Sequence, residues 1–131
     1  MSLINEIKYK LQKYPSLSYS ESENSITIHT PNRETGFDIS LYIDSGEYKA
    51  YTVAFGNWHG PFDTEEEAGE FVAFGLSNEC RVREIFRGKS PCKWVIESLQ
   101  NGNWIMKQET GLLFFPFWKK KTEKIYQNSI I

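Results

Sequence analysis

The chain has 131 residues, a length typical of one domain, and 40% of them are hydrophobic, enough to build a core. The formal net charge is −2, so charge alone indicates neither a nucleic-acid partner nor a membrane partner. No stretch approaches the roughly 20 apolar residues of a membrane span, and the amino-terminal residues lack the apolar run of a signal peptide. We therefore expect one cytoplasmic domain over residues 1–131 and no membrane contact.

The charge is unevenly distributed along the chain. Residues 1–78 contain 5 Lys/Arg and 12 Asp/Glu, whereas residues 79–131 contain 10 and 5. One interpretation is that the two halves interleave in the fold, so that their charges mix. The other is an acidic face opposite a basic face, which would steer a partner or favour a homodimer. The first is the default, because sequence halves seldom form spatial halves.

Cysteine and histidine indicate no metal site and no disulfide framework. Cys80 and Cys92 are too few for a disulfide scaffold and form no CxxC motif, so we expect two free thiols in strands. The two histidines, His29 and His59, fall in separate elements without the spacing of metal ligands. No metal and no cofactor is predicted.

The amino-terminal half predicts a helix followed by three strands. Apolar residues at helical spacing predict a short amphipathic helix over residues 2–14, which Pro15 ends. The polar residues 16–24 predict a loop, with a short irregular strand as the alternative. Alternating apolar residues then predict strands over Ser25–Thr30, Phe37–Asp44 and Tyr48–Phe55. Their short, turn-rich connections predict an antiparallel meander.

A second helix is expected after the aromatic turn that begins at Gly56. Thr64 is a good N-cap, and Glu67 three residues later completes a capping box. The apolar stripe that should face the sheet consists of Ala68, Phe71, Val72, Gly75 and Leu76. A glycine inside a helix costs roughly 1 kcal/mol relative to alanine. Gly75 therefore predicts a close approach of the helix to the sheet, whereas Gly69 has no such explanation.

The carboxy-terminal half reads as a run of strands. Strands are expected over Glu79–Arg87, Cys92–Gln100, Trp104–Glu109 and the short segment Leu112–Phe115, with a last strand or short helix over Thr122–Asn128. Runs of strands without alternating helices are typical of α+β folds. We expect a single twisted antiparallel sheet of about six or seven strands in a meander, with the N-terminal and central helices packed on one face.

The turn before the central helix contains Trp58 and His59, to which no capping or core role can be assigned. His59 is close in sequence to Glu65 and Glu66, and histidine changes charge near neutral pH. It is either a polar anchor or general base in a pocket, or a turn residue that bonds the backbone. No nucleophile elbow, HExxH motif or dinucleotide fingerprint is present, so no catalytic residue is predicted.

Three arginines share one face of a predicted strand. Arg81, Arg83 and Arg87 recur at even spacing, and guanidinium groups hold carboxylates or phosphates in bidentate fashion. If this face is exposed, it is a candidate contact for an acidic partner. The alternative is a solvated face whose arginines pair with glutamates from neighbouring strands.

Tryptophans provide the remaining candidate binding residues. Trp94 and Trp104 flank the Asn101-Gly102 hairpin, where paired rings form either a binding platform or part of the core. Trp118 ends an aromatic run that begins at Phe114 and precedes three lysines. This pattern fits a protein contact with a charged rim, a nucleic-acid contact, or core aromatics beside solvated lysines. Nucleic acid is the least favoured, because the chain is acidic and has no recognition motif.

Several motifs carry a resemblance to a known class of protein. They are Trp58-His59-Gly60-Pro61-Phe62, Gly75-Leu76-Ser77, Trp94 with Glu97, Gly102-Asn103-Trp104 and Phe117-Trp118. Over roughly residues 36–128 the chain resembles small uncharacterised bacterial single-domain proteins, some of which are similar to the immunity proteins that bind polymorphic toxins. The resemblance implies a protein partner and supplies no catalytic residue.

Together, these patterns predict a non-enzymatic protein-binding domain, and the resemblance implies that it is immunity-like. The alternative is a small-ligand binder or enzyme with a pocket between the central helix and the sheet, built from His59, Glu97 and an arginine.

Overall fold

The computed structural model describes residues 2–47 and 49–130. The first part of the chain contains α1 (Leu3–Leu11), β1 (Ser18–Ser22), β2 (Ser25–His29), β3 (Ile39–Asp44), β4 (Ala50–Phe55), β5 (Trp58–Phe62) and α2 (Glu65–Leu76). The second part contains β6 (Cys80–Arg87), β7 (Ser90–Gln100), β8 (Asn103–Gly111) and β9 (Lys121–Tyr126). Tyr48, with which one predicted strand begins, lies outside the described residues.

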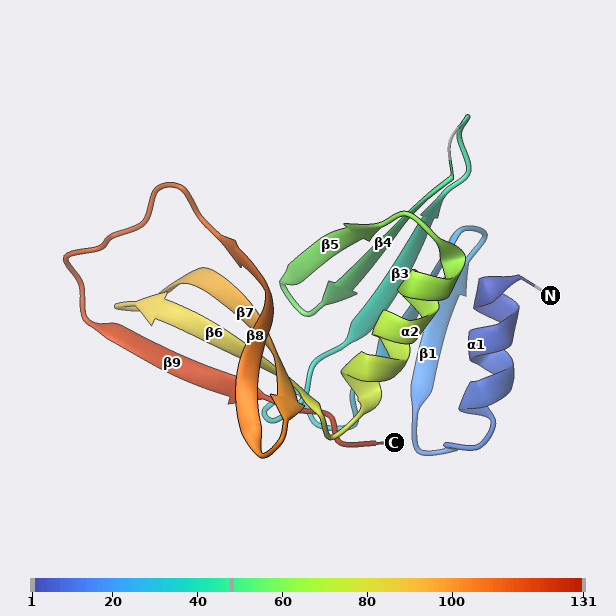
Figure 1. The fold of residues 1–131 in the computed structure, drawn as a ribbon, viewed down its shortest axis with the longest axis horizontal. Coiled ribbons are helices and arrows are strands. Elements are labelled where there is room, and N and C mark those ends of the chain that lie inside the picture. Colours follow the sequence, from blue (N-terminus) through green and yellow to red (C-terminus); the bar gives the residue numbers. More distant parts are fainter. Residues whose placement is uncertain (1, 48, 131) are drawn as a thin grey trace.

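The strands form two antiparallel sheets (Figure 1). The first has the order β1-β2-β3-β4-β5 and the second the order β8-β7-β6-β9. The prediction of an α+β fold is confirmed, and the prediction of a single sheet is wrong. Helix α2 separates β5 from β6 along the chain, and β6 pairs with β7 on one side and with β9 on the other. No hydrogen-bonding edge of β6 therefore remains for the first sheet.

The first sheet buries the face that its alternating residues predict. Ile39 pairs with Phe55 and Leu41 with Val53, and all four are 0–1% exposed. Figure 1 shows α1 and α2 side by side against this sheet. The hydroxyl of Thr64 accepts a hydrogen bond from the backbone N–H three residues on, at 3.1 Å, which confirms the predicted cap.

Gly75 allows α2 to approach the first sheet closely. A Cβ atom at this position would lie 2.6 Å from Cζ of Phe55 and 2.9 Å from Cδ1 of Ile39, nearer than real Cβ contacts. Only a residue without a side chain fits here, so the predicted reason for a glycine on the apolar stripe is confirmed.

One core joins the two sheets. Cys80, Val82 and Ile96 of the second sheet belong to the same buried cluster as the residues of the first sheet and the helices. After β9, the amide of Asn128 returns to the first half of the chain. It donates to the carbonyls of Phe37 and Gly75 at 3.0 and 3.1 Å and accepts from the N–H of Phe37 at 3.0 Å. The carboxy-terminal segment therefore fastens the second sheet to the first.

The structure decides four local predictions. The alternative of a short strand within residues 16–24 is correct, since β1 is an edge strand whose exposed polar residues give no alternation. The aromatic turn is also a strand, because β5 pairs with β4 along its whole length. The predicted strand Leu112–Phe115 is wrong: the chain turns at Pro116 and the segment forms a loop. The last strand is confirmed as β9.

The two sequence halves form two spatial halves. Every described strand of the first sheet precedes residue 63, and every described strand of the second follows residue 79. The default expectation of mixed charge is therefore wrong, and the acidic half lies beside a basic half. No helix within residues 2–47 and 49–130 has both the length and the apolar character needed to cross a membrane.

Candidate functional site

The segment between β8 and β9 carries the most exposed large apolar side chains of the described structure. Leu113, Phe114, Phe117 and Trp118 are 86%, 87%, 68% and 72% exposed. Large apolar side chains that are exposed together in one segment mark interaction sites on soluble domains. The segment lies at the end of the molecule farthest from α1 (Figure 1). We call residues 112–118 the aromatic loop.

The aromatic loop is anchored at both ends. It connects β8 and β9, the two edge strands of the second sheet, and so crosses the end of that sheet. The N–H of Leu112 donates to the carbonyl of Cys92, and the N–H of Gly88 donates to the carbonyl of Lys120, each at 2.8 Å. Further backbone hydrogen bonds turn the chain around Pro116. A loop held in this way loses less conformational entropy on binding than a free one.

Cationic residues flank the aromatic loop: three lysines follow it in the sequence, and two more cationic residues lie at the β6–β7 turn, where Arg87 pairs with Lys121 of β9. We call them the basic rim: Arg87, Lys89, Lys119, Lys120 and Lys121. The guanidinium of Arg87 lies 5.9 Å from the ring centroid of Phe115, and its Nη1 donates to the carbonyl of Phe117 at 3.5 Å. An apolar centre with aromatic residues and a charged edge is the usual composition of a protein–protein interface.

Arg81 and Arg83, by contrast, are engaged within the chain. Nε of Arg81 donates to Oε1 of Glu97 at 2.6 Å, and Nη2 of Arg83 donates to Oε2 of the same carboxylate. Glu97 is buried, and the guanidinium of Arg81 lies 4.3 Å from the ring centroid of Trp104. This is the cross-strand pairing expected as the alternative to partner binding. Of the three arginines, Arg87 alone belongs to the basic rim.

Trp58 and His59 do not come together in a site. Trp58 is 2% exposed and packs against Phe55 and Phe71, with ring centroids 5.5 Å apart in both pairs. These rings fill the space between α2 and the first sheet, where the alternative interpretation placed a ligand pocket. His59 is exposed on the edge strand β5, and no carboxylate of the described residues forms an ion pair with it.

Trp94 and Trp104 lie on opposite faces of the second sheet. Nε1 of Trp94 donates to Glu84, which is on one face, whereas Trp104 lies under Arg81 on the other. The two rings therefore form no common platform. Glu84 was not among the predicted site residues. The only sequence signal for it is a charged residue alternating with apolar Val82 and Phe86 on one strand face.

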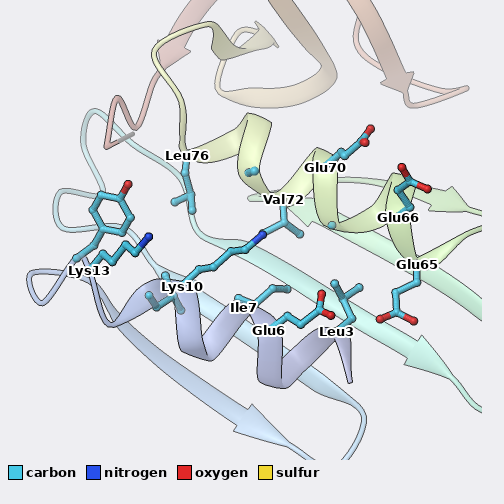
Figure 2. Close-up of a pocket in the computed structure, with 14 residues that line it drawn as sticks. Leu3, Glu6, Ile7, Lys10, Lys13, Glu65, Glu66, Glu70, Val72 and Leu76 are labelled. Atoms are coloured by element: carbon cyan, nitrogen blue, oxygen red, sulfur yellow. The ribbon is translucent and has the colours of Figure 1, made fainter. Parts of the chain in front are cut away.

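A groove of about 660 Å³ separates α1 from α2 (Figure 2). Its floor includes Leu3, Ile7 and Leu76, whose exposed fractions are only 6–8%. Figure 2 shows Glu66 and Glu70 pointing away from this floor and Lys10 reaching across it. An occupant would remove little further apolar surface from water, so the groove is a weaker candidate than the aromatic loop.

Nucleophilic and metal chemistry find little support in the described residues. Burial raises the pKa of the Cys80 thiol to about 12, so the nucleophilic thiolate does not form near neutral pH. Cys92 is also a free, buried thiol. Within residues 2–47 and 49–130, no group of three or more His, Cys, Asp and Glu side chains is placed to hold a metal ion.

Comparisons with known proteins give no family for this chain. No protein-family model, no curated protein and no solved structure matches it.

Proposed function

We propose that this protein is a non-enzymatic protein-binding domain whose contact surface is the aromatic loop with its basic rim. The observation that carries the proposal is the exposure of four large apolar side chains, 68–87% each, in an anchored loop. Covering them would remove roughly 500 Å² of apolar surface from water, about 12 kcal/mol before the costs of association. The cost of association is of the same order, so the affinity depends on how well the partner fits the aromatic loop and the basic rim.

The chemistry of the surface indicates the kind of partner. The second sheet and its connections hold 10 Lys/Arg and 5 Asp/Glu, so a matching surface has an apolar pocket bordered by carboxylates. The resemblance to immunity proteins makes a toxin our first candidate partner. We place the complex in the bacterial cytoplasm, where the free thiols Cys80 and Cys92 stay reduced.

Site-specific photo-crosslinking in the cells that naturally produce the protein tests this proposal. A photoreactive phenylalanine analogue replaces Phe114 in the aromatic loop. The matched control places it at Tyr42, which is 49% exposed on β3 of the first sheet. We expect one discrete protein adduct at Phe114 that is absent at Tyr42, and the purified partner should then bind the purified domain in a defined ratio.

Other outcomes would contradict the proposal. Adducts only with lipid or nucleic acid would assign the aromatic loop to a different class of partner. Identical protein adducts at Phe114 and Tyr42 would show that the aromatic loop has no special role.

A further inference from the structure

Glu84 is a buried carboxylate without a cationic partner. Its exposed fraction is 8%, and no Lys, Arg or His of the described residues forms an ion pair with it. It accepts hydrogen bonds from Trp94 Nε1 at 2.7 Å, Tyr126 OH at 3.1 Å and Asn57 Nδ2 at 3.4 Å. These donors fix the orientation of the carboxylate, and none of them is a cation.

A cavity of about 360 Å³ lies beside this carboxylate, between the two sheets. Its walls include aromatic rings from both halves of the chain: Phe37, Phe55, Trp94 and Tyr126. Polar groups of Thr30, Asn57 and Glu84 also line the cavity, so its wall is partly aromatic and partly polar. Small-ligand sites are concave and combine apolar and aromatic walls with a few polar groups that fix the orientation of the ligand. The volume suits a small molecule rather than a peptide.

The other charged side chains at the cavity form no direct ion pair with Glu84 in the part of the chain that the structure describes. Asp38 and Arg33 also line the cavity, but the guanidinium of Arg33 lies 3.6 Å from the carboxylate of Asp38. Lys124 is opposite Glu84 in the register of β6 and β9, yet its Nζ lies over the ring of Tyr126, 4.9 Å from the centroid. Burial and the adjacent Glu84 raise the pKa of Tyr126, and the ammonium group of Lys124 opposes that rise.

We propose that this cavity binds a small primary alkylammonium ion. The ammonium group pairs with Glu84, which supplies the charge, and the carbon chain packs against the partly exposed rings of Trp94 and Tyr126. Rings of tryptophan and tyrosine also attract cations through their faces. The site is separate from the aromatic loop and does not depend on the proposed protein partner.

The indole N–H of Trp94 provides a direct reporter, because it is bonded to the carboxylate in question. The experiment titrates n-butylammonium chloride into ¹⁵N-labelled full-length protein and follows the indole N–H resonances by NMR. Sodium butyrate and n-butanol serve as controls of the same chain length. We expect a saturable shift of the Trp94 resonance with butylammonium alone, while the Trp118 resonance of the aromatic loop stays in place.

The variant Glu84→Gln separates a ligand site from a purely structural hydrogen-bond cluster. The amide keeps the size of the side chain but carries no charge, so we expect at least about tenfold weaker butylammonium binding in a folded protein. Equal binding by Glu84→Gln, or equal shifts with butanol, would overturn the proposal. The absence of any saturable shift in the wild type would also overturn it. The wild-type comparison of butylammonium with butanol decides the question even if the variant fails to fold.

Discussion

The substitution Gly75→Ala tests how closely α2 packs on the first sheet. Alanine in place of a helical glycine is worth about 0.5–1 kcal/mol in helix propensity. Here the new methyl group would lie 2.6 Å from a ring atom of Phe55, which is fully buried and has no room to move. Overpacking of this kind costs about 1–3 kcal/mol. We expect a net loss of about 1–2 kcal/mol in the free energy of unfolding.

Gly69→Ala is the matched control in the same helix. Its methyl group would lie 3.1 Å from Cδ1 of Leu3, the flexible end of a side chain in the first turn of α1. A small rotation relieves that contact, so the helix-propensity gain should prevail and stability should rise by about 0.5 kcal/mol. Urea unfolding measures both variants, and a fall of 1–2 kcal/mol lowers the midpoint by roughly 0.5–1 M. If Gly75→Ala proved as stable as Gly69→Ala, the close approach of α2 would be refuted.

Three further substitutions test the account. Glu97→Ala should destabilise the fold by about 3 kcal/mol in urea unfolding, because it removes the buried carboxylate that Arg81 and Arg83 share and leaves Arg83 only the more distant Glu123; a loss under about 1 kcal/mol would contradict this. Thr64→Ala should cost about 1 kcal/mol through the lost cap of α2, and an unchanged midpoint would argue against the cap. The free energy of unfolding should fall as pH rises above 9. In the unfolded chain the Cys80 thiol loses its proton there, whereas in the folded protein its pKa is raised to about 12 and it keeps the proton. Cys80→Ala should make the dependence of this free energy on pH shallower by about 1.4 kcal/mol per pH unit. An unchanged slope would contradict the raised pKa of Cys80.

Local patterns predicted much of this fold. The cap and apolar stripe of α2 are determined by residues within one helix, so the sequence is sufficient to place them. The Asn101-Gly102 turn is equally local, and both residues have the positive φ angles, 52° and 78°, that this dipeptide favours.

Strand pairing was not predictable in the same way. Alternation shows which face of a strand is buried but does not determine which other strand pairs with it. The pairing of β6 with β9 joins residues about forty positions apart, and it is what creates a second sheet. The edge strand β1 has no buried face to give a signal.

The candidate site also combines features that local sequence shows with features that depend on long-range packing. The aromatic run that ends at Trp118 was visible in the sequence, but its exposure depends on the turn at Pro116 and on the anchoring of the aromatic loop. Trp58 lacked an assigned role because the hairpin that pairs it with Phe55 was not predicted, and because Phe71 meets it only after α2 packs on the sheet. The surroundings of Glu84 come from three separate segments, so no local pattern indicates them.

The most direct test of the central claim is the affinity of the crosslinked partner for two double variants, measured by isothermal titration calorimetry. Phe114→Ser/Trp118→Ser removes two exposed rings of the aromatic loop, and Tyr9→Ser/Tyr42→Ser removes two exposed rings elsewhere. Both should unfold within about 0.5 kcal/mol of the wild type, because these side chains are exposed. We predict binding at least about 100-fold weaker for the aromatic-loop variant and unchanged for the control. Wild-type affinity in the aromatic-loop variant would contradict the account.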